Sequence, residues 1–142
     1  LRDTIWALNA SGFSFEDLSS RIFNFIEKAQ AAKENILFQL TVDDRCKAKS
    51  FTSLEGINIY RTIQEALNNA IKYADATEIS IHVNAVNERM NILISDNGKG
   101  FDRDAIELGN GILNMQKRIE DIGGTFVIHS EQLKGTQITI SL

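Results

Sequence analysis

The amino-acid sequence predicts an α+β domain: a two-layer α/β sandwich in which about three helices cover one face of a mixed sheet of about five strands. The prediction rests on two kinds of pattern and on their order along the chain. Apolar residues recur at helical spacing in three segments, within residues 14–33, 59–74 and 112–122. Apolar and polar residues alternate, as in half-buried strands, in residues 36–41, 79–84, 90–95, 126–130 and 136–142.

The composition is that of one folded domain. The chain has 142 residues, of which 43% are apolar and 24% charged, and this favours a globular domain over a disordered chain. Its net charge of −4 gives no reason to expect nucleic acid or an anionic membrane as a partner. No signal peptide or membrane-spanning run is visible. The single cysteine, Cys46, cannot form an internal disulfide, which fits a reducing compartment, and we expect it in a surface loop.

The first predicted helix begins after Ser14, a residue type that caps helix N-termini. Asp17 adds negative charge to the first turn, which the helix dipole favours. The residues that face the core share helical spacing: Leu18, Ile22, Phe25, Ile26 and Ala29. A strand over residues 36–41 follows. The polar stretch from Asp43 to Ser53 predicts a loop, with the second helix starting at Ile59.

The second helix carries the first candidate site. Its apolar stripe consists of residues three, four or seven apart: Ile59, Ile63, Ala66, Leu67, Ala70, Ile71 and Ala74. The opposite side carries Glu65, Asn68, Asn69 and Lys72. A carboxylate, an amide oxygen and an ammonium group on one face suit Mg²⁺ and the phosphates that it bridges. The alternative is an ordinary amphipathic helix with a solvated polar face.

The second candidate site follows the strand at residues 90–95. Asp96-Asn97-Gly98 could form a hairpin turn, but no alternating strand comes directly after it. Glycines at positions 98, 100, 109 and 111 instead predict backbone that approaches a ligand closely or offers N–H groups to an anion. The patterns G-x-x-x-x-G-K-[ST] and G-x-G-x-x-G are both absent. Any nucleotide site must therefore belong to another architecture.

Turn signals define the remaining elements. Asn87-Glu88-Arg89 predicts the turn between the strands at 79–84 and 90–95. The helix that begins at Ile112 should end at Gly123-Gly124, which permits a left-handed C-terminal cap. Residues 126–130 and 136–142 then predict a closing antiparallel pair.

Four motifs in this order resemble those of the ATP-binding domain of histidine kinases. Glu65-Ala-Leu-Asn-Asn-Ala-Ile-Lys-Tyr73 is similar to the N box, and Asp96-Asn-Gly-Lys-Gly-Phe-Asp102 to the G1 box. The stretch from Gly109 to Ile119 resembles the G2 region, and Gly135-Thr136 resembles the closing Gly-Thr. The wider superfamily includes DNA gyrase, mismatch-repair and heat-shock chaperone ATPases. The nitrate-sensor and desaturase-regulator branch of histidine kinases is the most similar.

The resemblance implies a role for each residue on the base side of an ATP site. Asp96 would accept a hydrogen bond from the exocyclic amine of adenine. Gly98 would leave room for the purine, with Gly100 in the same glycine-rich stretch. Thr136 would support the adenine edge through its hydroxyl or a bridging water. Tyr73 would lie along the base, or else be an ordinary aromatic residue at a helix end.

On the phosphate side, the resemblance implies that Asn69 ligates Mg²⁺. Glu65 would hold a metal-bound water or orient the attacking group. Lys72 would meet a phosphate as a mobile charge. Main-chain N–H groups at the start of the next helix would grip the phosphates, and they belong to Gly109, Asn110, Gly111, Ile112 and Leu113.

The resemblance also implies a domain organisation. Residues 1–12 would be the end of a dimerisation helix and a linker, and residues 13–142 the ATP-binding catalytic domain. Only Asp102 to Leu108 separate the G1 and G2 motifs, so the lid over the nucleotide should be short. Because the chain starts at Leu1, we expect a piece of a longer protein. We expect this piece to be the cytoplasmic part of a membrane-anchored sensor that dimerises only at full length.

The implied activity is transfer of the ATP γ-phosphate to a histidine in a two-component system. His82 and His129 lie in strand patterns without a following acidic residue, so we expect the acceptor on a dimerisation domain outside the chain and a response regulator as a further partner. The alternative is an anti-sigma-factor-like serine kinase, a partner-binding regulator of the same fold. A linker from a dimerisation helix at the N-terminus would favour the kinase, and an N-terminal strand would favour the regulator.

Overall fold

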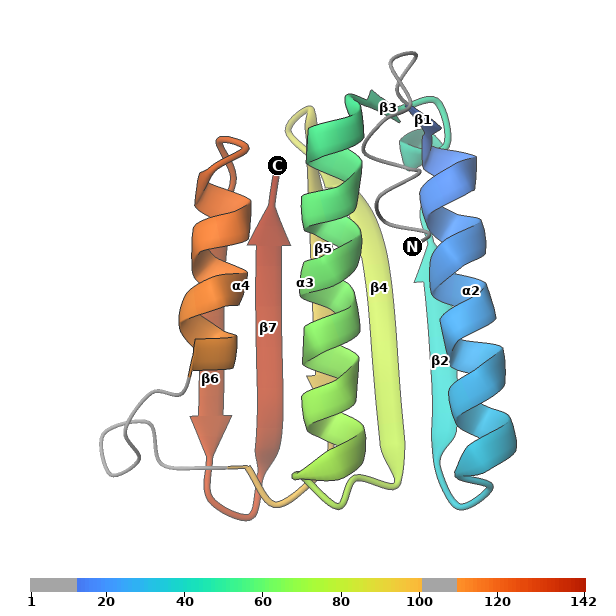
Figure 1. Ribbon diagram of the computed structural model, residues 1–142, viewed down its shortest axis with the longest axis vertical. Helices are drawn as coiled ribbons and strands as arrows, with labels where there is room; N and C mark the ends of the chain where they lie inside the picture. Colours follow the sequence, from blue (N-terminus) through green and yellow to red (C-terminus); the bar gives the residue numbers. More distant parts are fainter. Residues whose placement is uncertain (1–12, 101–109) are drawn as a thin grey trace.

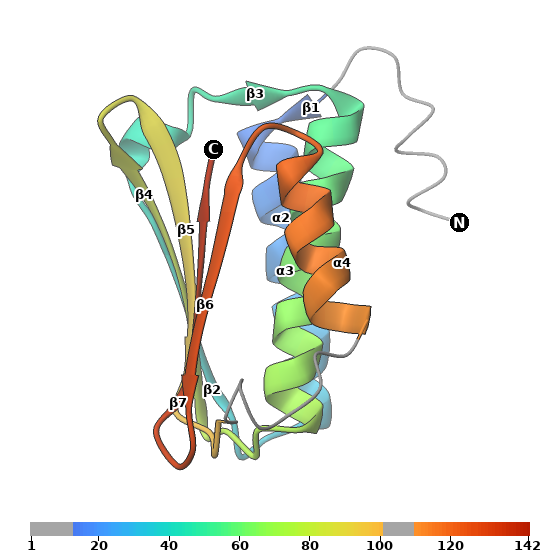
Figure 2. The same ribbon diagram turned by 90° about the vertical axis from the view of Figure 1, so that its left-hand side faces the viewer.

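Three helices lie side by side on one face of a five-stranded sheet in the computed structural model, which describes residues 13–100 and 110–142 (Figure 1). The helices are α2 (Phe15–Ala32), α3 (Ser53–Lys72) and α4 (Asn110–Glu120). The strands are β2 (Leu37–Val42), β4 (Glu78–Val86), β5 (Arg89–Asp96), β6 (Thr125–Glu131) and β7 (Gly135–Ser141). Seen from the side, they form two layers (Figure 2). The predicted fold is confirmed.

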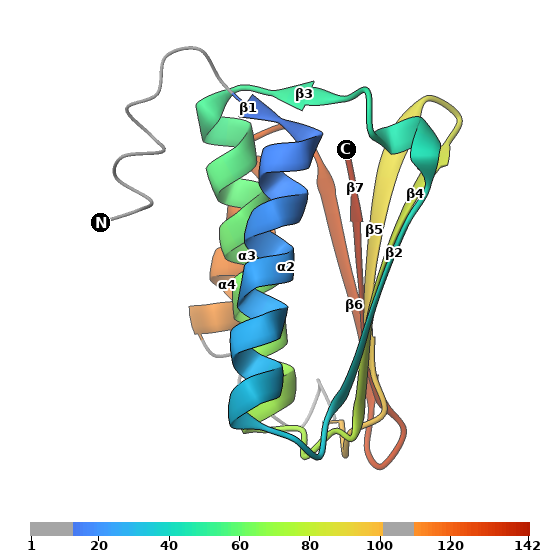
Figure 3. The same ribbon diagram turned by 90° about the vertical axis from the view of Figure 1, so that its right-hand side faces the viewer.

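The sheet is mixed, with strand order β2-β4-β5-β7-β6. β2 runs parallel to β4, and the other neighbours are antiparallel. A second, two-stranded sheet pairs β1 (Phe13–Ser14) with β3 (Ser50–Phe51) at one end of the domain, where β3 crosses from the helical layer towards the sheet (Figure 3). Within the described residues, no helix is both long enough and apolar enough to cross a membrane.

Capping boxes define the starts of the two long helices. Ser14 caps α2 as predicted, because its hydroxyl accepts from the N–H of Asp17 at 3.2 Å and the Asp17 carboxylate accepts from the N–H of Ser14 at 3.1 Å. Thr52 and Glu55 form the same arrangement at the start of α3, at 3.1 and 2.8 Å. The second helix therefore begins at Ser53 and not at Ile59. The prediction of a loop up to Ser53 was wrong also because β3 and a short 3₁₀ helix, η1 (Asp44–Cys46), lie within it.

Cys46 is buried, with 2% of its surface exposed, and this corrects the expectation of a surface loop. Asp43 begins η1: its carboxylate accepts from the N–H of Arg45 at 2.9 Å, while its own N–H donates to the carbonyl of Val83 at 2.8 Å. These bonds fold η1 back onto β4. Burial raises the pKa of the Cys46 thiol, so the group is held in its protonated form, which is a poor nucleophile.

The core lies between the helices and the inward side of the sheet. Its fully buried members come from α2, α3, α4 and the central strands: Leu18, Ile59, Ile63, Leu67, Ile79, Ile81, Ile92, Met115, Ile119 and Ile140. The predicted turn at Asn87-Glu88 is confirmed, with φ of 51° and 67°. The predicted left-handed cap after α4 is also confirmed, since Gly123 has a φ of 82°.

We expect Leu67→Ala to lower the free energy of unfolding by about 3 kcal/mol, because the Leu67 side chain is wholly buried and its loss leaves a cavity. Leu54→Ala is the matched control on the same helix, since Leu54 is 61% exposed. Urea unfolding of the two variants measures the difference. Equal stability losses would contradict the assignment of Leu67 to the core.

Candidate nucleotide-binding site

The predicted site residues come from four segments that meet at one end of the domain. The C-terminal half of α3, the end of β5, the start of α4 and the start of β7 all lie in the lower half of Figure 1. This end is opposite to β1 and β3 (Figures 2 and 3). Gly109, the predicted lid at 102–108 and the predicted linker at 1–12 lie outside the described residues. Figure 1 thus shows how elements distant in sequence are brought together.

On α3, the predicted metal ligands stand one turn apart on the same face. Glu65 and Asn69 are half-buried, and the Glu65 carboxylate lies against the first turn of α4 at Gly111. Lys72 is exposed at the helix end, in keeping with a mobile charge. Tyr73 is the C-terminal cap of α3 and is 68% exposed. Its place along the base stays a prediction.

Asp96 ends β5 directly across from Thr136 of β7. Its Oδ1 accepts from the N–H of Gly98 at 2.8 Å. Burial raises the pKa of the Asp96 carboxyl, although hydrogen bonds from the N–H groups of Gly98 and Thr136 act in the opposite direction. The Asp96 carboxylate is therefore a partly desolvated hydrogen-bond acceptor at a strand end.

The side chain of Asn97 holds the backbone that follows Asp96 in position. The sequence motifs do not predict this role. Its Oδ1 accepts from the N–H groups of Thr77 and Glu78, each at 2.9 Å, and its Nδ2 donates to Thr77 Oγ1 at 2.9 Å. The side chain therefore clamps the end of β5 to the start of β4. The sequence motif predicts a role for Asp96 but none for Asn97, because the partner segment of Asn97 lies about twenty positions earlier.

The glycine-rich segment is held between the end of α3 on one side and the β6–β7 turn on the other. A Cβ at Gly98 would collide with the carbonyl of Ala74, so the glycine is required by close approach to the end of α3. The N–H of Lys99 donates to that same carbonyl at 2.7 Å. From the other side, the N–H of Leu133 in the β6–β7 turn donates to the carbonyl of Lys99 at 2.5 Å. The hydroxyl of Thr136 shares a hydrogen bond of 2.8 Å with that of Ser130.

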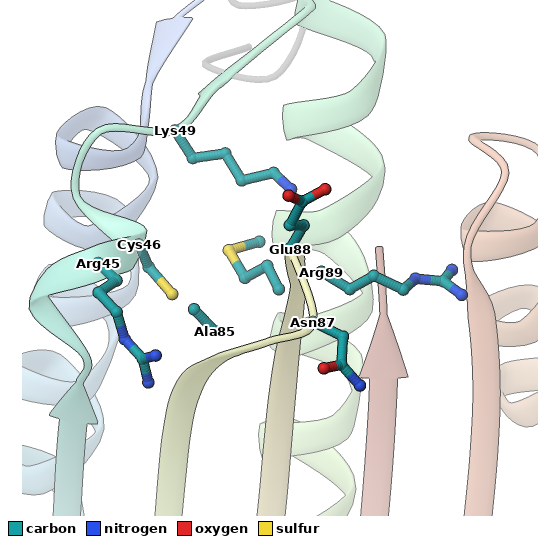
Figure 4. A pocket seen from close by; sticks show the side chains of 8 residues that line it. Arg45, Cys46, Lys49, Ala85, Asn87, Glu88 and Arg89 are labelled. Atoms are coloured by element: carbon teal, nitrogen blue, oxygen red, sulfur yellow. The ribbon is translucent and has the colours of Figure 1, made fainter.

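A hollow of about 320 Å³ lies at the opposite end of the domain (Figure 4). Its lining includes Arg45, Lys49 and Arg89, with Cys46 at its inner side, and none of the predicted site residues. Arg45 is paired with Asp43 at 2.6 Å. Figure 4 shows that Lys49 reaches towards Glu88, whereas Arg89 extends away from Cys46. These cationic side chains do not converge on a common point. The hollow is therefore not a candidate nucleotide site.

Comparisons with known proteins agree with the fold. The model of the "Histidine kinase-, DNA gyrase B-, and HSP90-like ATPase" family matches residues 55–142. A sensor-like histidine kinase of Chloroflexus aurantiacus, described as uncharacterized, is 31% identical over 147 residues that cover 99% of this chain and 24% of that protein. The sensor histidine kinase YdfH of Bacillus subtilis is 40% identical over 92 residues, which cover 60% of this chain and 22% of that protein.

Solved structures share the fold. The catalytic domain of the histidine kinase ThkA superposes with a TM-score of 0.72 at 18% identity, covering 92% of this chain and 93% of that one. The histidine kinase AdeS of Acinetobacter baumannii also gives a TM-score of 0.72, at 16% identity, covering 99% of this chain and 75% of that one.

Fold and site together define a nucleotide-binding domain with helices on one face of a mixed sheet. The chain belongs to the family of histidine kinase-, DNA gyrase B- and HSP90-like ATPases. The resemblance drawn from the four sequence motifs is thereby confirmed. The chain spans only 24% and 22% of the two curated relatives, which are sensor kinases.

Proposed function

We propose that this domain binds ATP with Mg²⁺ and transfers the γ-phosphoryl group to a histidine on a dimerisation domain outside residues 13–142. The observation that carries the proposal is the meeting of three features at one end of the domain. These are the oxygen ligands of α3, the half-buried Asp96 at the end of β5, and the first turn of α4. They match the needs of the metal, the base and the phosphates respectively.

The base side is supported by the surroundings of Asp96. Adenine presents an exocyclic amine that donates, and a carboxylate that is already partly desolvated accepts from it at little further cost of hydration. Thr136 lies directly across from Asp96 in the strand pair and would support the same edge. Asn97 and the β6–β7 turn hold this part of the backbone still, which keeps the acceptor in position.

The proposed Mg²⁺ site is supported by the type and number of side-chain oxygens that α3 offers. Within residues 13–100 and 110–142, no three histidine, cysteine, aspartate or glutamate side chains form a metal-binding group. Mg²⁺ commonly takes only one or two protein oxygens and completes its shell with phosphates and water. Glu65 and Asn69 fit that requirement, and the bound ion would supply charge neutralisation between the phosphates. Glu65 would then orient the attacking group, and N–H groups around Gly111 to Leu113 would bind phosphate oxygens.

The histidine that accepts the phosphoryl group is proposed to lie outside this domain, because both histidines of the chain lie in the sheet. His82 is half-buried in the middle of β4, and His129 is in β6. Neither is carried by a helix that could be delivered in line with the γ-phosphate. The proposal extends to a linker at residues 1–12, a response regulator as the next partner and a location in the cytoplasm, where ATP is available.

Incubation with γ-labelled ATP tests the proposal. The chain alone should show negligible labelling, and addition of the polypeptide with the dimerisation helices should give acid-labile label on a histidine of that polypeptide. Acid-labile phosphate on His82 or His129 of the isolated chain would overturn the proposal. Label on the serine of an added regulatory partner would favour the anti-sigma-factor-like alternative.

A further inference from the structure

Gly111 stands where the side chain of Glu65 leaves no room for a Cβ atom. A Cβ built on Gly111 would come within 2.7 Å of Glu65 Oε1 and 3.6 Å of its carboxyl carbon. The first distance is too short for a carbon and an oxygen that are not bonded, so one of the two groups would have to move. The Glu65 carboxylate of α3 can therefore take this place beside the first turn of α4 only because residue 111 is a glycine.

The carboxylate is the group that would give way. α4 is held against α3 further along, where Met115 and Ile119 are wholly buried in the shared core. In addition, Asn58 Nδ2 of α3 donates to the carbonyl of Arg118 of α4 at 3.0 Å. The Glu65 carboxylate, in contrast, is the far end of a flexible side chain that is only half-buried. A methyl group at position 111 would therefore displace the carboxylate and leave the two helices in place.

We infer that Gly111 is a positioning residue for Glu65: its missing side chain leaves free the place that the catalytic carboxylate takes beside the first turn of α4. This inference rests on the proposed function, because it assigns Gly111 a second task beside its main-chain contact with phosphate. The two tasks make different predictions. Loss of a phosphate contact weakens ATP binding even without Mg²⁺, whereas displacement of the carboxylate slows transfer and leaves the metal-free binding of ATP unchanged.

Gly111→Ala separates the two tasks. We expect the dissociation constant for ATP without Mg²⁺ to stay within about threefold of the parent, while phosphoryl transfer to the added dimerisation domain, measured with Mg²⁺, falls by about tenfold or more. The melting temperature should not fall, since alanine favours a helix more than glycine does. Parent-like transfer would overturn the inference, and so would a loss of transfer that merely follows a loss of binding.

A double-mutant cycle shows whether Gly111 acts through Glu65. In the Glu65→Ala background there is no carboxylate to displace, so adding Gly111→Ala should not lower the residual rate further. An equal further loss would mean that Gly111 acts independently, and would overturn the inference. Asn114→Ala is the control on the same helix, because Asn114 is exposed, and it should behave like the parent.

Crystal structures of the parent and Gly111→Ala, both without nucleotide, give a readout that does not depend on activity. The Glu65 carboxylate should be displaced in the variant, with the backbones of α3 and α4 unchanged. A carboxylate in its parent position would overturn the inference. If the parent neither binds ATP nor transfers phosphate, the proposed function fails, and this structural comparison still decides whether Gly111 positions Glu65.

Discussion

Replacing Glu65 with alanine should reduce phosphoryl transfer from ATP to the added dimerisation domain by about 100-fold or more, as should Asn69→Ala. Transfer of this kind depends on placing the metal, the attacking group and the γ-phosphate in line, and these two side chains are the proposed source of that placement. Both are half-buried on one face of α3, a turn apart, so neither has another evident task in the core. The rate of acid-labile labelling measures the effect.

Replacing both histidines of the chain is the control for this prediction. His82→Gln together with His129→Gln should leave labelling intact, because both residues lie in the sheet and neither belongs to the proposed site. Substantial labelling by Glu65→Ala and Asn69→Ala would contradict the proposed roles. Loss of labelling in the histidine variant would contradict the proposal that the acceptor lies outside.

Asp96→Asn should weaken ATP binding by about 2 kcal/mol, or about 30-fold, since the amide turns a donor towards the donating amine of adenine in a partly desolvated place. Calorimetric titration measures this change. Thr139→Ala is a suitable control, because Thr139 lies further along β7 in the register row of His82 and Leu93. If Asp96→Asn and the parent bound ATP with equal affinity, the proposed contact between Asp96 and adenine would be contradicted.

The same variant makes a prediction about pH. Burial raises the pKa of Asp96 in the folded state above its ordinary value of 3.8. The folded state therefore binds more protons than the unfolded state between these two pKa values, and the parent loses stability as the pH rises through this interval. Asparagine does not titrate, so the stability of Asp96→Asn relative to the parent should increase over the same interval. Urea unfolding at a series of pH values would contradict this if the difference were constant or of the opposite sign.

The fold could be predicted from the sequence because its elements have strong periodicity. The stripe from Ile59 to Ala70 and the alternation of Ile79, Ile81 and Val83 each place residues in the core, as the structure confirms. The start of α3 was missed because its first turn, Ser53-Leu-Glu-Gly56, combines two polar residues and a glycine with an exposed leucine and does not extend the apolar stripe. The sequence does mark this helix start through Thr52 and Glu55, which form a reciprocal capping box. The spacing of apolar residues does not reveal such a pair.

The site could be predicted only in part, because contacts between segments distant in the sequence leave no local pattern. Glu65, Asn69 and Asp96 were found through the motifs that resemble a known family, and the fold does bring their elements to one end. The clamp made by Asn97 joins segments about twenty positions apart, and the contact of Glu65 with Gly111 joins two helices. Nothing local marks either contact. The burial of Cys46 was wrongly predicted for the same reason.

The central claim is that ATP binds at the end of the domain formed by α3, β5, α4 and β7. The most direct test is to titrate the ¹⁵N-labelled chain with Mg²⁺-ATP and follow each backbone amide by NMR. The account predicts that the shifts concentrate at Asn69, Asp96 to Gly98, Gly111 to Leu113 and Thr136. Amides around Arg45 and Asn87, at the opposite end, should stay unchanged. A titration without shifts, or with shifts confined to that opposite end, would contradict the account.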